Sequence, residues 1–216
     1  MALSGEEELQ VRETCQAEPA VKMAQLGEMH AASFAEDPKH LGFVLARYKF
    51  VAKMLVGKGC VLEIGCGDTT GARLVKSAVG ALTGIDQVRY PGSVQSIPVD
   101  VFDAVEEKLP KNCYDAIYAL DVLEHISLEK EDQFLSNVVQ ALRGGGVFIV
   151  GTPSLESQQY ASRLSKLHHV NCMTEDQFRV VLQMYFANVF VLGMNDETLH
   201  CGYGPMTHYR LAICTV

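Results

Sequence analysis

Two carboxylates and an imidazole lie close together in the segment Asp121-Val-Leu-Glu124-His125, and a further histidine, His169, follows later in the chain. If a helical turn begins at Asp121, Glu124 and His125 fall at the third and fourth positions after it, and the three side chains face one side of the turn. Carboxylate oxygens and imidazole nitrogens are ligands for Mg²⁺, Mn²⁺ or Fe²⁺. The spacing therefore indicates a partial divalent-metal site at Asp121, Glu124 and His125, to which a fourth ligand could come from the segment Leu167-His168-His169-Val170.

Two other interpretations of these residues stay open. His125 or His169 could act without a metal, as the general base that takes a proton from a hydroxyl nucleophile. Alternatively, Glu124 could form a cap or an ion pair, with His125 only lining a pocket. His168 is expected to be an exposed neighbour of His169.

A glycine-rich turn lies earlier in the chain, in the segment Val61-Leu-Glu-Ile-Gly-Cys-Gly-Asp-Thr-Thr-Gly71. A short apolar strand runs into this turn and helical spacing follows it, which is the usual place for a nucleotide-type ligand in an open α/β sheet. Gly65 and Gly67 allow a sharp bend and a close approach of the backbone to the ligand. Cys66 between them is expected to fill a small space rather than act as a nucleophile.

Acidic residues at two strand ends indicate what kind of ligand this turn binds. The second predicted strand stops at Asp86, where a carboxylate can accept hydrogen bonds from both hydroxyls of a ribose. Glu63 would repel a pyrophosphate and suits an ammonium group better. Thr70 also occupies the position of the third glycine of a dinucleotide fingerprint. These features argue against a nicotinamide dinucleotide.

Strands and helices alternate along most of the chain, which predicts a parallel sheet covered on both faces. Strands are expected over 60–64, 81–85, 96–102, 114–120 and 147–150, and helices over 41–55, 71–79, 133–142 and 174–186. Two further strands, 189–192 and 209–215, have only a loop between them and are therefore expected to be antiparallel neighbours.

Composition limits the class of protein. The chain has 216 residues, 48% of them hydrophobic, and a net charge of -8 from 18 Lys+Arg and 26 Asp+Glu. These values predict one folded domain over 21–216 after a flexible arm over 1–20. The acidic balance argues against nucleic-acid partners. No apolar run is long enough for a membrane helix, and the start lacks the order of a signal peptide.

Seven cysteines without a CxxC pair argue against a zinc knuckle or a disulfide framework. They predict reduced thiols in a cytoplasmic protein. His30 and His40 precede the nucleotide-type fold and are expected on the surface, and His200 and His208 are expected in a loop.

Taken together, the motifs resemble those of the class I S-adenosylmethionine-dependent methyltransferases, in particular the small O-methyltransferases. The resemblance runs from about Lys39 to the C-terminus and is carried by VLEIGCGDTTG (61–71), TGID (83–86), YDAIYALDVLEHI (114–126) and GGGVFIVGTPS (144–154). It implies a Rossmann-like, doubly wound α/β sheet of seven strands, mostly parallel with an antiparallel last strand.

The resemblance also implies which residues hold the S-adenosylmethionine cofactor. The methionine part would lie against Glu63, Gly65, Cys66 and Gly67, the ribose against Asp86, the adenine against Phe102 and Asp103, and the path to the methyl group against Leu120 and Asp121. Asp100 competes with Asp103 as the strand-end acid. Tyr48, beside Arg47, could cover the carboxylate of the cofactor or simply pack in the core.

The segment from Asp121 to His125 is similar to the acid-x-x-Glu-His motif of the metal-dependent ubiquinone-pathway O-methyltransferases and the small-RNA 2′-O-methyltransferases. In the RNA enzymes a later His precedes a Thr-led helix, which matches His169 ahead of Thr174. Asp121 stands where those families have Glu, and its shorter side chain reaches less far toward a metal.

Residues 153–173 and 195–208 have polar groups and no expected sheet role, so we expect them to bind the acceptor. The expected function is methylation of a hydroxyl on a small molecule such as a sugar, a nucleotide-sugar or another secondary metabolite, by a monomer or homodimer. The alternatives are a metal-dependent RNA 2′-O-methyltransferase, which the acidic charge disfavours, and a non-catalytic cofactor-binding module. N-methylation, which needs no metal, also stays open.

Overall fold

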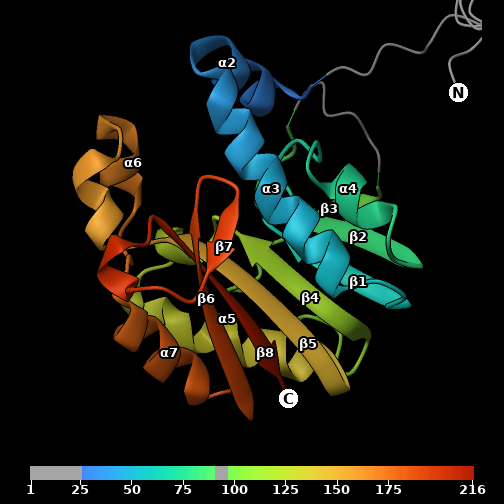
Figure 1. Cartoon of the computed structure of the whole chain (residues 1–216). Helices are drawn as coiled ribbons and strands as arrows, with labels where there is room; N and C mark the ends of the chain where they lie inside the picture. Colours follow the sequence, from blue (N-terminus) through green and yellow to red (C-terminus); the bar gives the residue numbers. More distant parts are fainter. Residues whose placement is uncertain (1–25, 91–96) are drawn as a thin grey trace, which may run out of the picture.

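The computed structural model describes residues 26–90 and 97–216, and the expected arm over 1–20 lies outside these residues. Figure 1 shows a single twisted sheet with helices on both sides. The described strands pair in the order β3-β2-β1-β4-β5-β8-β6-β7. Their bounds are β1 Cys60–Ile64, β2 Ala81–Asp86, β3 Val99–Val101, β4 Tyr114–Leu120, β5 Leu142–Pro153, β6 Asn188–Asn195, β7 Thr198–His200 and β8 Tyr209–Thr215.

Strands β1 to β5 are parallel to one another, and β8 runs antiparallel between β5 and β6. The doubly wound α/β fold and the antiparallel last strand are therefore confirmed. The expected number of seven strands is wrong for the described chain, because β6 turns back at Asp196 and pairs with the short edge strand β7. Three residues are too few to show the alternation that identifies a strand.

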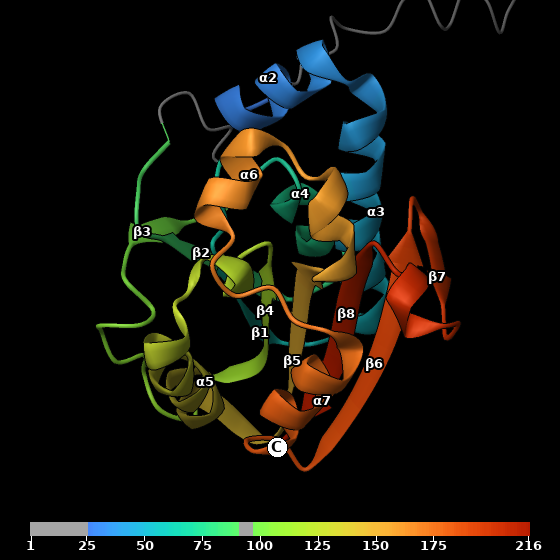
Figure 2. The ribbon, with the colours of Figure 1, turned by 90° about the vertical axis from the view of Figure 1, so that its left-hand side faces the viewer.

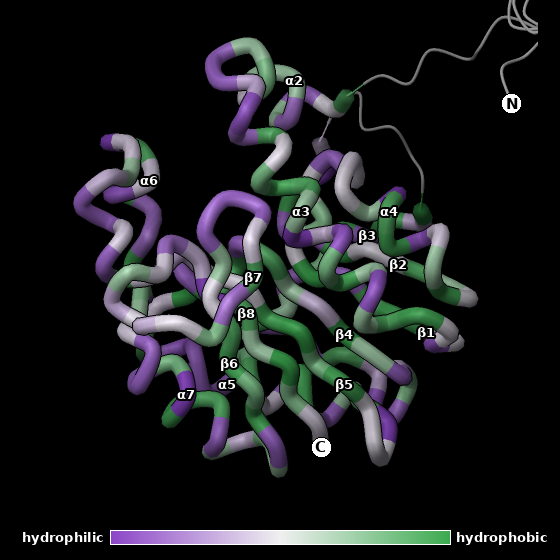
Figure 3. The backbone as a smooth tube through the Cα atoms, in the orientation of Figure 1, coloured by the Kyte–Doolittle hydropathy of each residue, from purple (hydrophilic) through white to green (hydrophobic). Residues whose placement is uncertain are grey.

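The helices cover the two faces of the sheet in sets that follow the alternation of side chains along each strand. From β4, Ile117 and Ala119 pack on the side of α5 (Leu128–Ala141) and α7 (Glu175–Gln183). Ala116 and Tyr118 pack on the other side, against α3 (Pro38–Met54) and α4 (Ala72–Lys76). Figure 3 shows the resulting hydrophobic strands between more hydrophilic helix surfaces and loops.

Most helix bounds agree with the periodicity of the sequence. α3 begins after the N-cap Asp37, whose side chain accepts the Lys39 N–H, and it buries Tyr48 and Val51. α7 begins at a capping box formed by Thr174 and Gln177, where the predicted helix over 174–186 begins. β5 is longer than predicted because its pairing with β4 begins before the glycine run and resumes after a register shift.

Three elements near the carboxyl ends of the parallel strands were not predicted. Figures 1 and 2 show two of them, α2 (Glu28–Glu36) and α6 (Arg163–His168), at the same end of the sheet. The short 3-10 turn η2 (Glu156–Tyr160) leads from β5 into α6. We call residues 154–173, which contain η2 and α6, the lid.

Two further observations concern the described ranges alone. Six cysteines in residues 26–90 and 97–216 are free. No helix in those ranges is long and apolar enough to cross a membrane.

Candidate functional site

Two adjoining cavities open at the carboxyl ends of the parallel strands. The first, of about 310 Å³, is lined by Asp86, Phe102 and Asp103 among others, and we call it the ribose-side cavity. The second, of about 490 Å³, is lined partly by the lid, and we call it the lid-side cavity. Both are lined by Met29, Gly65, Gly67, Asp121 and His125, so the two cavities meet at these residues.

The glycine turn forms the wall between β1 and the cavities. Gly65 and Gly67 have φ angles of 73° and 51°, which glycine adopts readily and other residues rarely adopt. A Cβ at Gly65 would also clash with the side chain of Val122. The Gly67 N–H donates to Asp86 Oδ2 at 2.9 Å, so the predicted ribose acid also fixes the turn. Cys66 is buried and lines the lid-side cavity.

Glu63 has a different environment from the one that the resemblance implies. Within the described part of the chain it lines neither cavity, and its side chain is buried. Tyr118 donates a hydrogen bond to Glu63 Oε2 at 2.8 Å. Burial raises the pKa of Glu63 to about 8, although hydrogen bonds with Tyr118 and Tyr48 oppose the rise. The carboxyl group therefore joins two tyrosines beneath the turn and does not face the ligand space.

Tyr48 packs in the core and also reaches the lid-side cavity, and its contact with the cofactor carboxylate stays a prediction. It is buried, packs edge-to-face against Tyr118 at a centroid distance of 6.3 Å, and also lines the lid-side cavity. Its ring lies where a Cβ at Gly71 would fall, which explains the glycine at that position.

The predicted adenine residues lie at the ribose-side cavity. Phe102 and Asp103 line it, whereas Asp100 is exposed on β3 and lines neither cavity. Asp103 Oδ2 accepts a hydrogen bond from Gln87 at 3.0 Å, and Oδ1 accepts the Val105 N–H at 2.8 Å. This geometry favours Asp103 over Asp100, and contact with adenine stays a prediction.

Asp121 is tied to α3 and does not join the predicted metal ligands. Its φ of 56° places it outside the 3-10 turn η1 (Leu123–His125), so the expectation that Asp121, Glu124 and His125 face one side of a helical turn is wrong. Arg47 Nη1 donates to both carboxylate oxygens of Asp121, at 2.9 and 2.8 Å. The same guanidinium stacks 3.7 Å from the ring centre of Tyr209.

The structure brings the other three predicted ligands together. One ligand atom from each of Glu124, His125 and His169 lies within 4.8 Å of the others. Glu124 is buried, and Oε2 accepts a hydrogen bond from Thr152 at 3.3 Å. Oε1 is also buried and has no hydrogen-bond partner among the described residues. Burial, followed by the charge of Asp121, raises the pKa of Glu124 well above its usual value.

A cation fits this arrangement, because a buried carboxylate oxygen without a partner is costly and a metal would satisfy it. His125 Nδ1 lies 3.1 Å from the His168 carbonyl oxygen, and His169 Nδ1 lies 2.9 Å from Gln158 Oε1. Both acceptors occupy Nδ1 and leave Nε2 of each ring available as a ligand. Burial, and then the neighbouring His125, lower the pKa of His169, which favours the neutral form that a metal requires.

The expectation that His30 lies on the surface is wrong. Its Nδ1 lies 2.7 Å from Asp68 Oδ1, and its backbone N–H donates to Oδ2 at 3.1 Å. Asp68 is buried in the glycine turn; burial would raise its pKa, but the hydrogen bonds with His30 hold it below the usual value. This pair fastens α2 over the cavities, beside Met29. His40, by contrast, is exposed and contacts Ser33 at 2.8 Å.

The lid supplies most of the remaining wall. Ser157, Gln158, Tyr160 and Ser165 line the lid-side cavity, and the acceptor role expected for 153–173 stays a prediction. From the second expected segment, 195–208, His208 is the one described residue that lines it. Sequence reasoning missed Tyr209, which carries no local signal because the sheet alone brings it next to Arg47.

Comparisons with known proteins agree with this architecture. A family model described as a methyltransferase domain matches residues 36–185. A probable S-adenosylmethionine-dependent methyltransferase of Mycolicibacterium smegmatis is 32% identical over 116 residues, which are 50% of this chain and 42% of that protein. The ubiquinone biosynthesis O-methyltransferase of Rickettsia typhi is 26% identical over 113 residues, 49% of this chain and 45% of that protein. The matches thus span less than half of the length of these relatives.

Among solved structures, a SAM-dependent methyltransferase from Archaeoglobus fulgidus matches with a TM-score of 0.66 and 17% identity. The match covers 88% of this chain and 100% of that one. At this level of identity the likeness shows a common fold.

Proposed function

Because the chain belongs to the methyltransferase domain family, among the class I S-adenosylmethionine-dependent methyltransferases, we propose that it transfers a methyl group from S-adenosylmethionine to a hydroxyl of a small molecule. We further propose that a divalent metal held by Glu124, His125 and His169 assists the transfer. The observation that carries the proposal is the convergence of these three side chains beside the junction of the two cavities.

The ribose-side cavity suits the nucleoside part of the cofactor. Asp86 offers carboxylate oxygens to the ribose hydroxyls, and Phe102 and Ile126 offer apolar surface to the base. S-adenosylmethionine supplies a methyl group on a positively charged sulfur, which is already an activated electrophile. The residues around it therefore have to position the donor and the acceptor oxygen in line.

The junction of the cavities is the place where donor and acceptor can meet. His125 lines both cavities, and Glu124 and His169 line the lid-side cavity next to it. Glu124, His125 and His169 would hold the metal, which when bound would supply Lewis-acid chemistry that makes the acceptor hydroxyl more acidic. Overall, the S–CH₃ bond breaks, an O–CH₃ bond forms and the hydroxyl proton is released.

The metal would be a cation that accepts oxygen and nitrogen ligands together. One carboxylate and two imidazoles suit Mn²⁺ or Fe²⁺ better than Mg²⁺, which prefers oxygen ligands.

The lid-side cavity, of about 490 Å³, has the size of a small-molecule site. Ser157, Ser165 and Tyr160 offer hydroxyl groups to a hydroxylated acceptor. The RNA 2′-O-methyltransferase alternative is not favoured, because the net charge is -8. A non-catalytic module is not favoured either, because the family match extends over the site residues.

A transfer assay tests the proposal. Purified protein is incubated with methyl-labelled S-adenosylmethionine, Mn²⁺ and a panel of catechols, sugars and nucleotide-sugars, beside matched amines. We expect label in a hydroxylated acceptor, loss of transfer with a chelator and recovery when Mn²⁺ is added back. Transfer to amines alone, or transfer that a chelator leaves unchanged, would contradict metal-assisted O-methylation.

A further inference from the structure

We propose that Gln158 is a positioning residue: it holds the proton of His169 on Nδ1 and so keeps Nε2 available to bind the metal. The inference rests on the metal site of the proposed function. The inference adds Gln158, a lid residue that belongs to no motif, to the residues that support the metal site. The role of Gln158 can be measured without the metal.

The contact between the two side chains is direct. His169 Nδ1 lies 2.9 Å from Gln158 Oε1. An amide oxygen can only accept, so Nδ1 must carry the hydrogen, and Nε2 of the neutral ring keeps its lone pair. Within the described chain no other residue is recorded in a hydrogen bond with His169 Nδ1, so the tautomer depends on Gln158.

A second hydrogen bond fixes which end of the Gln158 amide faces His169. Gln158 Nε2 donates to the carbonyl oxygen of Ser154 at 3.3 Å. Because the NH₂ group is directed to Ser154, the amide oxygen is the atom left for the imidazole. A flipped amide would place NH₂ against Nδ1 and a carbonyl oxygen against another carbonyl oxygen.

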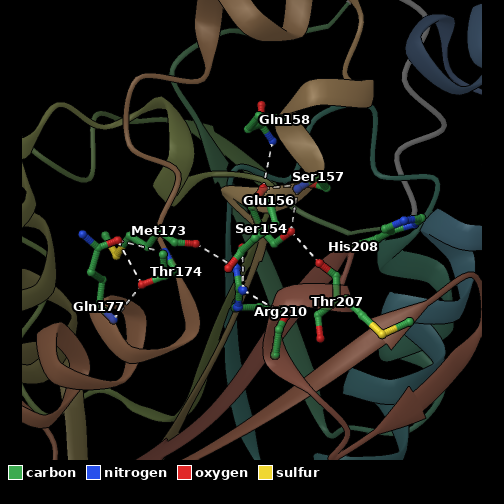
Figure 4. A network of polar contacts seen from close by, with 12 residues as sticks. Ser154, Glu156, Ser157, Gln158, Met173, Thr174, Gln177, Thr207, His208 and Arg210 are labelled. Atoms are coloured by element: carbon green, nitrogen blue, oxygen red, sulfur yellow. Dashed lines mark hydrogen bonds and ion pairs between the residues drawn. The ribbon is translucent and has the colours of Figure 1, made fainter.

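Ser154 is itself held by the sheet. It is fully buried, its N–H donates to the His208 carbonyl at 2.9 Å, and its Oγ donates to the Thr207 carbonyl at 2.5 Å. Ser157 donates to the same Ser154 carbonyl that accepts from Gln158. Figure 4 shows Ser154 between Thr207 on one side and Ser157 and Gln158 on the other.

Arg210 fastens both ends of the lid to β8. Its guanidinium is buried and donates to the Met173 carbonyl and to Glu156 Oε2, each at 2.7 Å (Figure 4). Near the lid's end, the Val170 N–H donates to the Glu124 carbonyl at 2.8 Å, which brings His169 beside Glu124. The backbone thus places the imidazole next to its fellow ligand, and Gln158 selects its tautomer.

His125 provides an internal comparison. Its Nδ1 faces the backbone carbonyl of His168 at 3.1 Å, and a side-chain substitution does not remove that oxygen. Gln159 provides a matched control, because it is the exposed neighbour of Gln158 and its Nε2 donates to the Glu156 carbonyl.

The first test is the tautomer of each histidine in the metal-free protein, from ¹H–¹⁵N NMR of the imidazole nitrogens at about pH 8, above the ordinary imidazole range. We expect both His125 and His169 to carry Nδ1–H in the parent protein. In Gln158→Leu the hydrogen of His169 should no longer be confined to Nδ1, and His125 should be unchanged. Gln158→Glu keeps an acceptor and should keep the hydrogen of His169 on Nδ1. Gln159→Leu should change neither histidine. An unchanged His169 in Gln158→Leu would overturn the proposal.

The second test is a titration of Mn²⁺ into protein saturated with S-adenosylhomocysteine. Gln158→Leu should weaken Mn²⁺ binding by about 10–100-fold, the usual effect of losing a partner of a ligating histidine. Gln158→Glu should bind Mn²⁺ more tightly than Gln158→Leu, because a carboxylate still accepts from Nδ1–H. Gln159→Leu should bind Mn²⁺ like the parent, and all variants should bind S-adenosylhomocysteine equally.

The two tests separate the failure of this inference from that of the proposed function. If the parent binds Mn²⁺ and Gln158→Leu binds it equally well, the role of Gln158 is overturned and the metal site stands. If the parent binds no Mn²⁺, the metal site is overturned and with it the purpose of the tautomer, whatever the NMR spectra show.

Discussion

Arg47 holds Asp121 through a single nitrogen, with Nη1 lying 2.9 Å from one carboxylate oxygen and 2.8 Å from the other. Arg47 belongs to α3 and Asp121 follows β4, so this ion pair ties the helix to the floor of the site. The carboxylate that the sequence motif offers to a metal is thus neutralised by an arginine. This explains why the structure groups three ligands and not four.

The first prediction separates Asp121 from the metal ligands. We expect Asp121→Asn to retain Mn²⁺ binding, because its carboxylate already has a partner in Arg47. We expect the isosteric Glu124→Gln to weaken binding by at least about tenfold, since even a residue that only supports a ligand contributes that much. Calorimetric titration of both variants checks this. An equal loss of Mn²⁺ affinity in the two variants would mean that Asp121 is also a metal ligand.

The second prediction concerns Glu63 and pH. Its pKa is raised to about 8 by burial, against an ordinary value of 4.5. The folded protein therefore keeps a proton that the unfolded chain releases between about pH 4.5 and about pH 8, and this contribution to stability falls as the pH rises through that window. The slope is at most about 1.4 kcal/mol per pH unit for the one proton involved.

Glu63→Gln is the matched variant, because an amide resembles the protonated carboxyl and can still accept from Tyr118. Urea unfolding of both proteins across this pH range should show the parent losing free energy of unfolding relative to the variant as the pH rises. Parallel profiles would mean that Glu63 is ionised in the folded protein.

The third prediction concerns the pair of His30 and Asp68. We expect His30→Leu to loosen α2, because this helix buries no residue of its own and depends on the contact with Asp68. Hydrogen exchange over 28–36 should accelerate, and S-adenosylhomocysteine should dissociate faster, since Met29 of α2 lines both cavities. Lys49→Leu, at an exposed position of the neighbouring helix α3, is the control. Equal effects of the two substitutions would show that the Asp68 contact does not hold α2.

The parts of the site that could be predicted from sequence are those that local pattern determines. The placement of Gly65, Gly67 and Asp86 follows from strands that run parallel and end at one edge of the sheet. Glu124, His125 and His169 were also predicted as a group. That prediction depended on a known motif, because no local sequence pattern indicates that His169 in the lid lies next to η1.

The remaining features depend on contacts between distant segments. The left-handed backbone at Asp121 and its pairing with Arg47 leave no periodic signal. Helix α2 lines the cavities with Met29, His30 and Ser33 and buries none of its residues, so its sequence shows no apolar stripe. Glu63 appeared to face a ligand because the two tyrosines that cover it come from α3 and β4 and meet only in the folded protein.

The measurement that tests the central claim most directly is the calorimetric titration of Mn²⁺ into protein saturated with S-adenosylhomocysteine, for the parent, His125→Ala, His169→Ala and the control His168→Ala. His168 is exposed and contributes its backbone carbonyl, which alanine keeps. The account predicts stoichiometric binding by the parent and the control, and loss of binding in the other two variants. No binding by the parent, or binding that survives in both ligand variants, would contradict a metal site at Glu124, His125 and His169.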